Sequence, residues 1–217
     1  ACSAGPSLIP VRAARPSDSP GDRRYMTRQF TPSATLLDGL REDILWLLIL
    51  IYAHRQRCAL PSLATMSYEA FALEALLLES ASRDIVTRLT ALDDDGRGIR
   101  SFQSAFAAMK REGLDPQRTA ALDKDVKAFR QSLNDLKVKH RNAYIAHVQE
   151  LAQVTPRVLD EPVEFADCAS RAVNLLDAMS GRTLTYMFKI GSTDELDLRQ
   201  KLGAPPHEVR SVKRTSR

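Results

Sequence analysis

The chain has 217 residues, of which 44% are apolar and 27% charged, as in an ordinary globular protein with one domain. This composition excludes a collagen-like or wholly disordered chain. Aromatic residues make up only 6%, so we do not expect a sheet that stacks RNA bases on aromatic side chains. The three cysteines are odd in number and far apart, which favours a reducing, cytoplasmic compartment without disulfides.

The formal net charge of +4 comes from the two ends of the chain. Residues 1–30 contain five Arg and two Asp, and residues 199–217 contain six Lys or Arg and one Glu. The ends therefore carry +3 and +5, which leaves −4 for residues 31–198. The overall charge is thus no argument for a nucleic-acid partner, and any such site must be a local patch.

The first 30 residues are rich in Pro, Ser, Gly and Arg and lack apolar periodicity, so we expect a disordered extension. They contain no apolar stretch long enough for a secretory signal. The first methionine is Met26, just before the helical pattern begins. We therefore expect native translation to start there, with residues 1–25 outside the native protein.

From residue 31 onward the apolar spacing predicts helices. Thr31 and Pro32 are typical of a helix start, and a core-facing stripe follows: Leu36, Leu37, Leu40, Ile44, Leu47, Leu48 and Ile51. The uncharged run 44–53 is half of a membrane span, which predicts a buried core helix and no membrane contact. Pro61 breaks the chain after this helix.

The second predicted helix runs from about Thr65 to Leu92. Its predicted inward side chains are Tyr68, Phe71, Ala72, Ala75, Leu76, Leu78, Ile85 and Leu89. Arg83, Asp84 and Arg88 are interpreted as a charge-paired face of this helix. The polar stretch 93–98 follows, and its three aspartates lack the alternating ligands and distal Glu of a calcium loop, which favours a solvated turn.

A short third helix follows Ser101 and stops at Gly113. Asp115 and Pro116 open a long fourth helix to about Gln153, with an apolar seam at Leu122, Val126, Phe129, Leu133, Leu136, His140, Ala143, His147 and Leu151. A fifth helix is predicted to start at residues 160–162, to continue through 184–187, and to end at Gly191.

These elements predict an all-α, up-and-down bundle of four long helices plus a short helix, with no strands. The domain is expected to span residues 31–190. Residues 1–30 and 191–217 are expected to be disordered tails, the second of them basic and flexible.

One group of residues is a candidate catalytic site. Arg141, Asn142 and His147 lie near the end of the fourth predicted helix. The pattern Arg-Asn-x-x-x-Ala-His resembles the Arg–His motif of the HEPN superfamily of helical nucleases and nucleotide-binding domains. It is most similar to the AbiU-type branch, which is associated with abortive phage infection and toxin systems. The resemblance extends loosely over residues 36–190, through the end of the second helix, the Asp–Gly loop and the Ser-Phe start of the third.

The resemblance implies a metal-independent endoribonuclease without a cofactor, acting as the toxin or effector of a bacterial anti-phage or toxin–antitoxin system. Arg141 would bind the scissile phosphate, His147 would move the proton as the 2′-hydroxyl attacks, and Asn142 would orient either group. On an α-helix the Arg and His lie about 120° apart and about 9 Å along the axis. A two-fold dimer, as in HEPN ribonucleases, would therefore bring two such pairs into one cleft.

Four neighbouring side chains are candidates for RNA contacts. Lys137, Lys139 and His140 would supply a local positive field, and Tyr144 would stack a base. The competing interpretation is structural, because His140 and His147 continue the apolar seam and Tyr144 would simply pack. Residue 149 is Gln where HEPN toxins modified by a partner nucleotidyltransferase carry Tyr, which argues against such a partner.

Two alternative functions remain open at this point. HEPN-like bundles that do not cleave serve as nucleotide-binding or protein-interaction modules, and the mildly acidic body of the chain suits that role. The second alternative is a helical adaptor in which the Arg and His have no chemical role. Since one bundle fold hosts unrelated functions, the positions of Arg141 and His147 must decide.

Overall fold

The computed structural model describes residues 31–96, 98–145, 164–190 and 194–204, with the side chains of 142–145, 190 and 194 excepted. Its elements in chain order are α1 (Ser33–Cys58), the 3-10 helix η1 (Pro61–Thr65), α2 (Tyr68–Ala91), α3 (Phe102–Arg111), α4 (Pro116–Ser132), α5 (Asn134–Leu136), the π-helix η2 (Lys137–Ile145), α6 (Ala166–Ser180), β1 (Met187–Ile190), β2 (Asp194–Asp197) and α7 (Leu198–Leu202).

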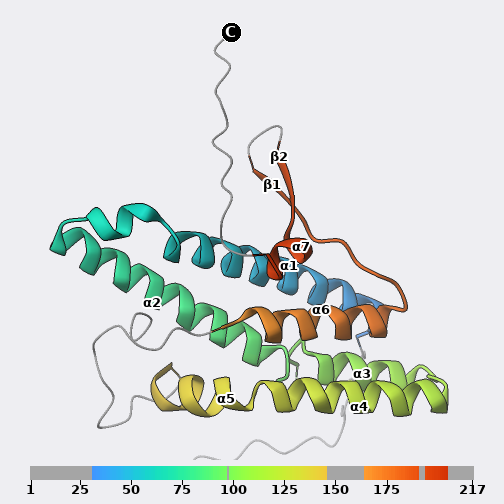
Figure 1. Ribbon diagram of the computed structural model, residues 1–217. Coiled ribbons are helices and arrows are strands. Elements are labelled where there is room, and N and C mark those ends of the chain that lie inside the picture. The colour runs from blue at the N-terminus through green and yellow to red at the C-terminus, as the bar shows by residue number, and fades with distance from the viewer. Residues whose placement is uncertain (1–30, 97, 146–163, 191–193, 205–217) are drawn as a thin grey trace, which may run out of the picture.

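The helices form a bundle around one core. Helix α1 packs against α2, α3 and α6, and α4 packs against α3 and α6, so that α6 lies between α1 and α4 (Figure 1). The predicted stripe of α1 is buried at Leu40, Ile44, Leu47, Leu48 and Ile51. The mainly α-helical bundle is therefore confirmed. Within the described ranges, no helix has the length and apolar character needed to cross a bilayer.

Local sequence signals set several helix ends. Ser67 and Asp115 accept hydrogen bonds from the first-turn N–H groups of α2 and α4, and Ser101 forms a capping box with Ser104 at the start of α3. Gly181 ends α6 in the left-handed conformation, with φ of 69°.

The C-terminal part of the domain differs from the prediction. Helix α6 ends at Ser180 rather than continuing through 184–187, and β1 and β2 form an antiparallel hairpin that pairs Phe188 with Leu196. The prediction of a strand-free chain is wrong, because the cap at Gly181 stops the helix. From there the burial alternates, with Leu184 and Tyr186 buried and residues 185 and 187 exposed.

The predicted domain boundary at residue 190 is also wrong. Leu198 and Leu202 of α7 are buried in the core. The Arg55 guanidinium donates to the carbonyl groups of residues 201, 202 and 204, which anchors α7 to α1. The domain therefore extends at least to Ala204, while the predicted extension 1–30 and the remaining tail, 205–217, lie outside the described residues.

The fourth predicted helix is not one continuous α-helix. Its seam is buried as predicted from Leu122 to Leu136, but α4 ends at Ser132 and the chain continues as α5 and then the π-helix η2. Residues 146–163, which include the predicted end of this helix and the predicted start of the fifth, lie outside the described part of the chain.

Candidate functional site

The Arg141 motif is carried by the π-helix η2. A π-helix has i→i+5 hydrogen bonds, is rare, and occurs frequently at functional sites. The nine residues of η2 pack against α2, and the Arg141 side chain is 38% exposed. The angle expected between Arg141 and His147 assumed an α-helix, so it does not hold over this segment. His147 and the side chains of Asn142 and Tyr144 lie outside the described residues.

The acidic loop after α2 lies against this π-helix, and the prediction that it is a solvated turn is wrong at Asp93. The Asp93 side chain is fully buried and accepts hydrogen bonds from Arg130 at 3.0 Å and from Lys137 at 2.6 Å. The Gln103 amide donates to the same carboxylate at 2.9 Å. Asp93 thus joins α3, α4 and η2 at the end of α2.

The two following aspartates face further cations. Asp94 Oδ2 lies 4.0 Å from Arg141 Nη2, and Asp94 Oδ1 accepts the Gly96 N–H at 2.8 Å. Asp95 lies 3.5 Å from Arg130 Nη2. Three carboxylates therefore face Arg130, Lys137 and Arg141, so the positive field expected from this segment is largely balanced within the protein.

The predicted RNA-contacting residues differ in their availability. Lys137 is held by the buried Asp93, which leaves its ammonium little freedom to bind a phosphate. Lys139 pairs with Asp135 one helical turn away at 3.2 Å, but both side chains are largely exposed. Such a pair contributes little, so Lys139 remains free to bind an anion. His140 is half-buried and interacts within the chain.

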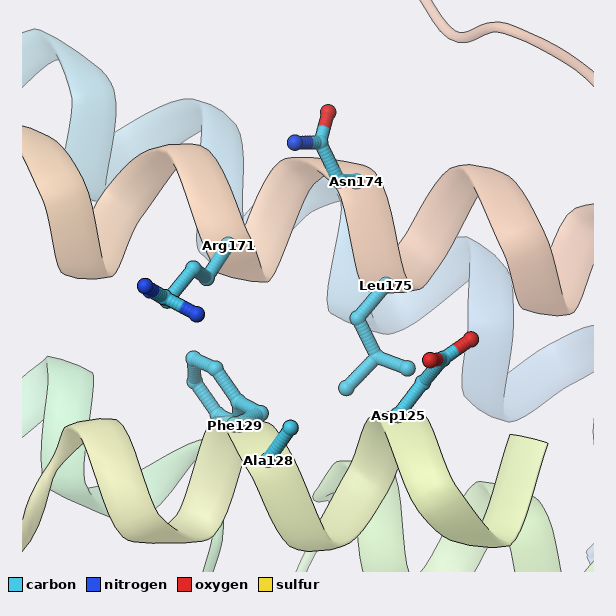
Figure 2. A pocket seen from close by; sticks show the side chains of 6 residues that line it. All are labelled: Asp125, Ala128, Phe129, Arg171, Asn174 and Leu175. Atoms are coloured by element: carbon cyan, nitrogen blue, oxygen red, sulfur yellow. The ribbon is translucent and has the colours of Figure 1, made fainter. Parts of the chain in front are cut away.

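A separate surface hollow of about 270 Å³ lies between α4 and α6. Its apolar floor is formed by Phe129 and Leu175, and Arg171 reaches from α6 toward the Phe129 ring, whereas Asn174 points away (Figure 2). None of the predicted site residues lines it. On α4 it involves Asp125 and Ala128, whereas Arg130 turns toward the acidic loop, so the hollow and the Arg141 motif are distinct features.

A third polar cluster was not predicted from the sequence. His54 is buried, its Nε2 lies 2.9 Å from Ser82 Oγ, and its ring meets Phe165 edge-on. Burial lowers the pKa of His54. Burial and the charge of Glu74 raise the pKa of the neighbouring Cys58 thiol, which disfavours the reactive thiolate. The buried His54–Ser82 hydrogen bond is best explained as a core contact between α1 and α2.

Comparisons of the chain with protein-family models, with curated proteins and with solved structures give no match. In the part of the chain that the structure describes, no three His, Cys, Asp or Glu side chains are grouped so that they could hold a metal ion.

Proposed function

We propose that the protein is a metal-independent endoribonuclease of HEPN type, with Arg141 and His147 as its catalytic residues. The observation that carries the proposal is the position of Arg141, which lies partly exposed on a rare π-helix at the surface of a mainly α-helical bundle. A π-helix lacks the regular α-helical hydrogen bonds and is frequent at functional sites, which supports a chemical role for this segment.

In the proposed reaction, Arg141 binds the scissile phosphate and offsets the negative charge that develops on it. The imidazole of His147 removes the proton of the RNA 2′-hydroxyl. The 2′-oxygen then bonds to phosphorus, the bond from phosphorus to the 5′-oxygen breaks, and that oxygen takes up a proton. The products are a 2′,3′-cyclic phosphate and a 5′-hydroxyl, and no metal or cofactor takes part.

The remaining roles belong to the same proposal. Asn142 orients the phosphate or the imidazole, Lys139 with His140 attracts RNA, and Tyr144 stacks a base. We propose that the active form is a cytoplasmic homodimer that acts in bacterial defence, with an antitoxin protein as its cognate partner.

A second candidate function is a non-catalytic module that binds nucleotides or a protein. It is favoured by the acidic loop, because Asp93 and Asp94 engage Lys137 and Arg141 and weaken the local attraction for a polyanion. A module of this kind would bind a single nucleotide or a protein surface without cleaving RNA.

RNA cleavage in the presence of EDTA separates the two candidates. The nuclease proposal predicts cleavage that survives chelation, produces cyclic phosphate ends, and disappears in both Arg141→Ala and His147→Ala. A folded wild-type protein that cleaves no RNA but binds a nucleotide would favour the binding module.

A further inference from the structure

The N-terminal half of α2 exposes three leucines and buries two glutamates. Leu73, Leu76 and Leu77 are 58, 53 and 61% exposed. On the opposite side of the same turns, Glu74 and Glu79 are buried. A helix on the surface of a domain normally turns its leucines inward and its glutamates outward.

Ion pairs explain how the two glutamates are accommodated. Arg57 of α1 donates to both carboxylate oxygens of Glu74, and these hydrogen bonds lower the pKa of Glu74. Glu79 accepts from Arg83 Nε at 2.8 Å. The Arg57–Glu74 pair joins α2 to α1, and Ala75 and Leu78 are buried on the inner side of this half of α2. The outward leucines are therefore not needed to attach α2 to α1.

The outward leucines form a strip suited to another helix. Positions 73, 76 and 77 follow the i, i+3, i+4 spacing that places side chains on one helical face. The exposed residue 80, one turn further along this face, is a serine, which allows a second helix to approach closely. The sequence prediction had placed Leu76 and Tyr68 inside, which is wrong for both, since Leu76 is 53% exposed and Tyr68, the first residue of α2, is 90% exposed. Exposed apolar clusters of this kind mark interaction surfaces.

We propose that the leucine strip, defined as Leu73, Leu76 and Leu77, joins two copies of this chain, with α2 antiparallel to the partner's α2 about a two-fold axis near Leu76. The charges on this face favour a second copy over another occupant. Glu69 and Arg83 each lie seven residues from Leu76, two helical turns to either side. An antiparallel two-fold pairing therefore sets each Glu69 opposite the partner's Arg83.

The pairing is self-complementary, as a two-fold interface requires. The Arg83 side chain binds Glu79 of its own helix and is partly exposed, so the pairing brings a second carboxylate, the partner's Glu69, near it. The inference rests on α2 alone and holds whether or not the protein cleaves RNA. Because η2 also packs against α2, the same axis would fix how the two Arg141 side chains are related.

Sedimentation velocity of the full chain over a wide concentration range tests the interface. We expect a dimer. We expect Leu76→Glu to raise the dissociation constant of this dimer at least about tenfold, because the two-fold axis would bring the two introduced carboxylates together. Met187→Glu is the matched control, since Met187 is a similarly exposed apolar side chain on β1, away from α2. Circular dichroism establishes that each variant is folded.

A cross-linking measurement keeps the proposal testable if Leu76→Glu fails to fold. In a Cys2→Ser, Cys58→Ser background, Leu76→Cys should link two chains through a short bismaleimide. Thr87→Cys on the same helix should not, because its two copies would lie about 33 Å apart along the paired helices. A chain that stays monomeric, a dimer that Met187→Glu disrupts equally, or equal cross-linking at both positions would overturn the proposal.

Discussion

Lys137 Nζ lies 2.6 Å from Asp93 Oδ2, and the Asp93 side chain is fully buried. This ion pair ties the first residue of the π-helix to the end of α2. Arg141 follows four residues later and faces Asp94 of the same loop. The acidic loop therefore fixes the face of η2 that carries the predicted site, and it also competes with any anion that approaches Arg141.

Asp93→Asn should destabilise the fold strongly. Removing one partner of a buried ion pair leaves Lys137 without its counter-charge in a mostly buried position, at a cost of about 3 kcal/mol in the free energy of unfolding. Urea unfolding measures this change. The control is Asp95→Asn, whose exposed contact with Arg130 is worth about 0.5 kcal/mol. Equal effects of the two variants would mean that the Asp93 pair has no special structural role.

Asp94→Asn should strengthen RNA binding through Arg141. The variant releases Arg141 from a partly exposed ion pair, so we expect affinity to rise about two- to fivefold. Fluorescence anisotropy with a single-stranded 2′-O-methyl RNA in EDTA measures binding to a ligand that the proposed reaction cannot cleave. Asp95→Asn removes the same charge from the same loop without touching Arg141. If both variants tighten binding equally, general electrostatics rather than release of Arg141 accounts for the effect.

Tyr186→Phe should stabilise the protein. The Tyr186 hydroxyl is buried without a hydrogen-bond partner among the described residues, and burial raises its pKa. Removing an unsatisfied hydroxyl should increase the free energy of unfolding by about 1 kcal/mol. Tyr186→Ala should instead lower it by about 3–5 kcal/mol, because a cavity replaces the ring. Thermal unfolding compares the variants, and a less stable Tyr186→Phe protein would show that the hydroxyl is in fact bonded.

Stability should fall as the pH drops through the range below 6.5. Burial lowers the pKa of His54 below its ordinary value of 6.5, so the unfolded chain binds a proton at this site that the folded chain excludes. Neutral His54 makes its full contribution to the free energy of unfolding above pH 6.5. This contribution is lost as the pH falls toward the pKa of His54 in the folded state. Urea unfolding at several pH values should show a shallower decline between pH 6.5 and 5 in His54→Gln. An unchanged slope in that variant would assign the decline to other groups.

Helix caps and apolar spacing in the sequence correctly predicted several helix starts and much of the buried core. The caps at Ser101 and Asp115 start α3 and α4, and the apolar spacing predicted the buried seam as far as Leu136. The strands were missed because the apolar residues Leu184, Tyr186 and Met187 were fitted to a helical period. The alternation of apolar Leu184, Tyr186 and Phe188 with polar Thr185 and Lys189 was the period-two signal that could have found them.

The arrangement of the candidate site could not be predicted from local sequence signals. Asp93 is buried because Arg130 and Lys137, 37 and 44 residues further along the chain, fold onto it. No spacing in the sequence encodes that contact or the π-helix next to it. The leucines of α2 were ambiguous for a related reason: Leu78 is buried and Leu76 is exposed, and only the folded structure, in which Glu74 pairs with Arg57 of α1, shows which face is inside.

The rate of RNA cleavage by Arg141→Ala in EDTA, relative to wild type, tests the central claim most directly. Arg171→Ala is the matched control, since it removes an exposed arginine from the hollow between α4 and α6. Loss of a phosphate-binding cation should slow cleavage by about 10²–10³-fold in Arg141→Ala, while Arg171→Ala keeps the wild-type rate. Wild-type cleavage by a folded Arg141→Ala protein would contradict the assignment of the catalytic site to η2.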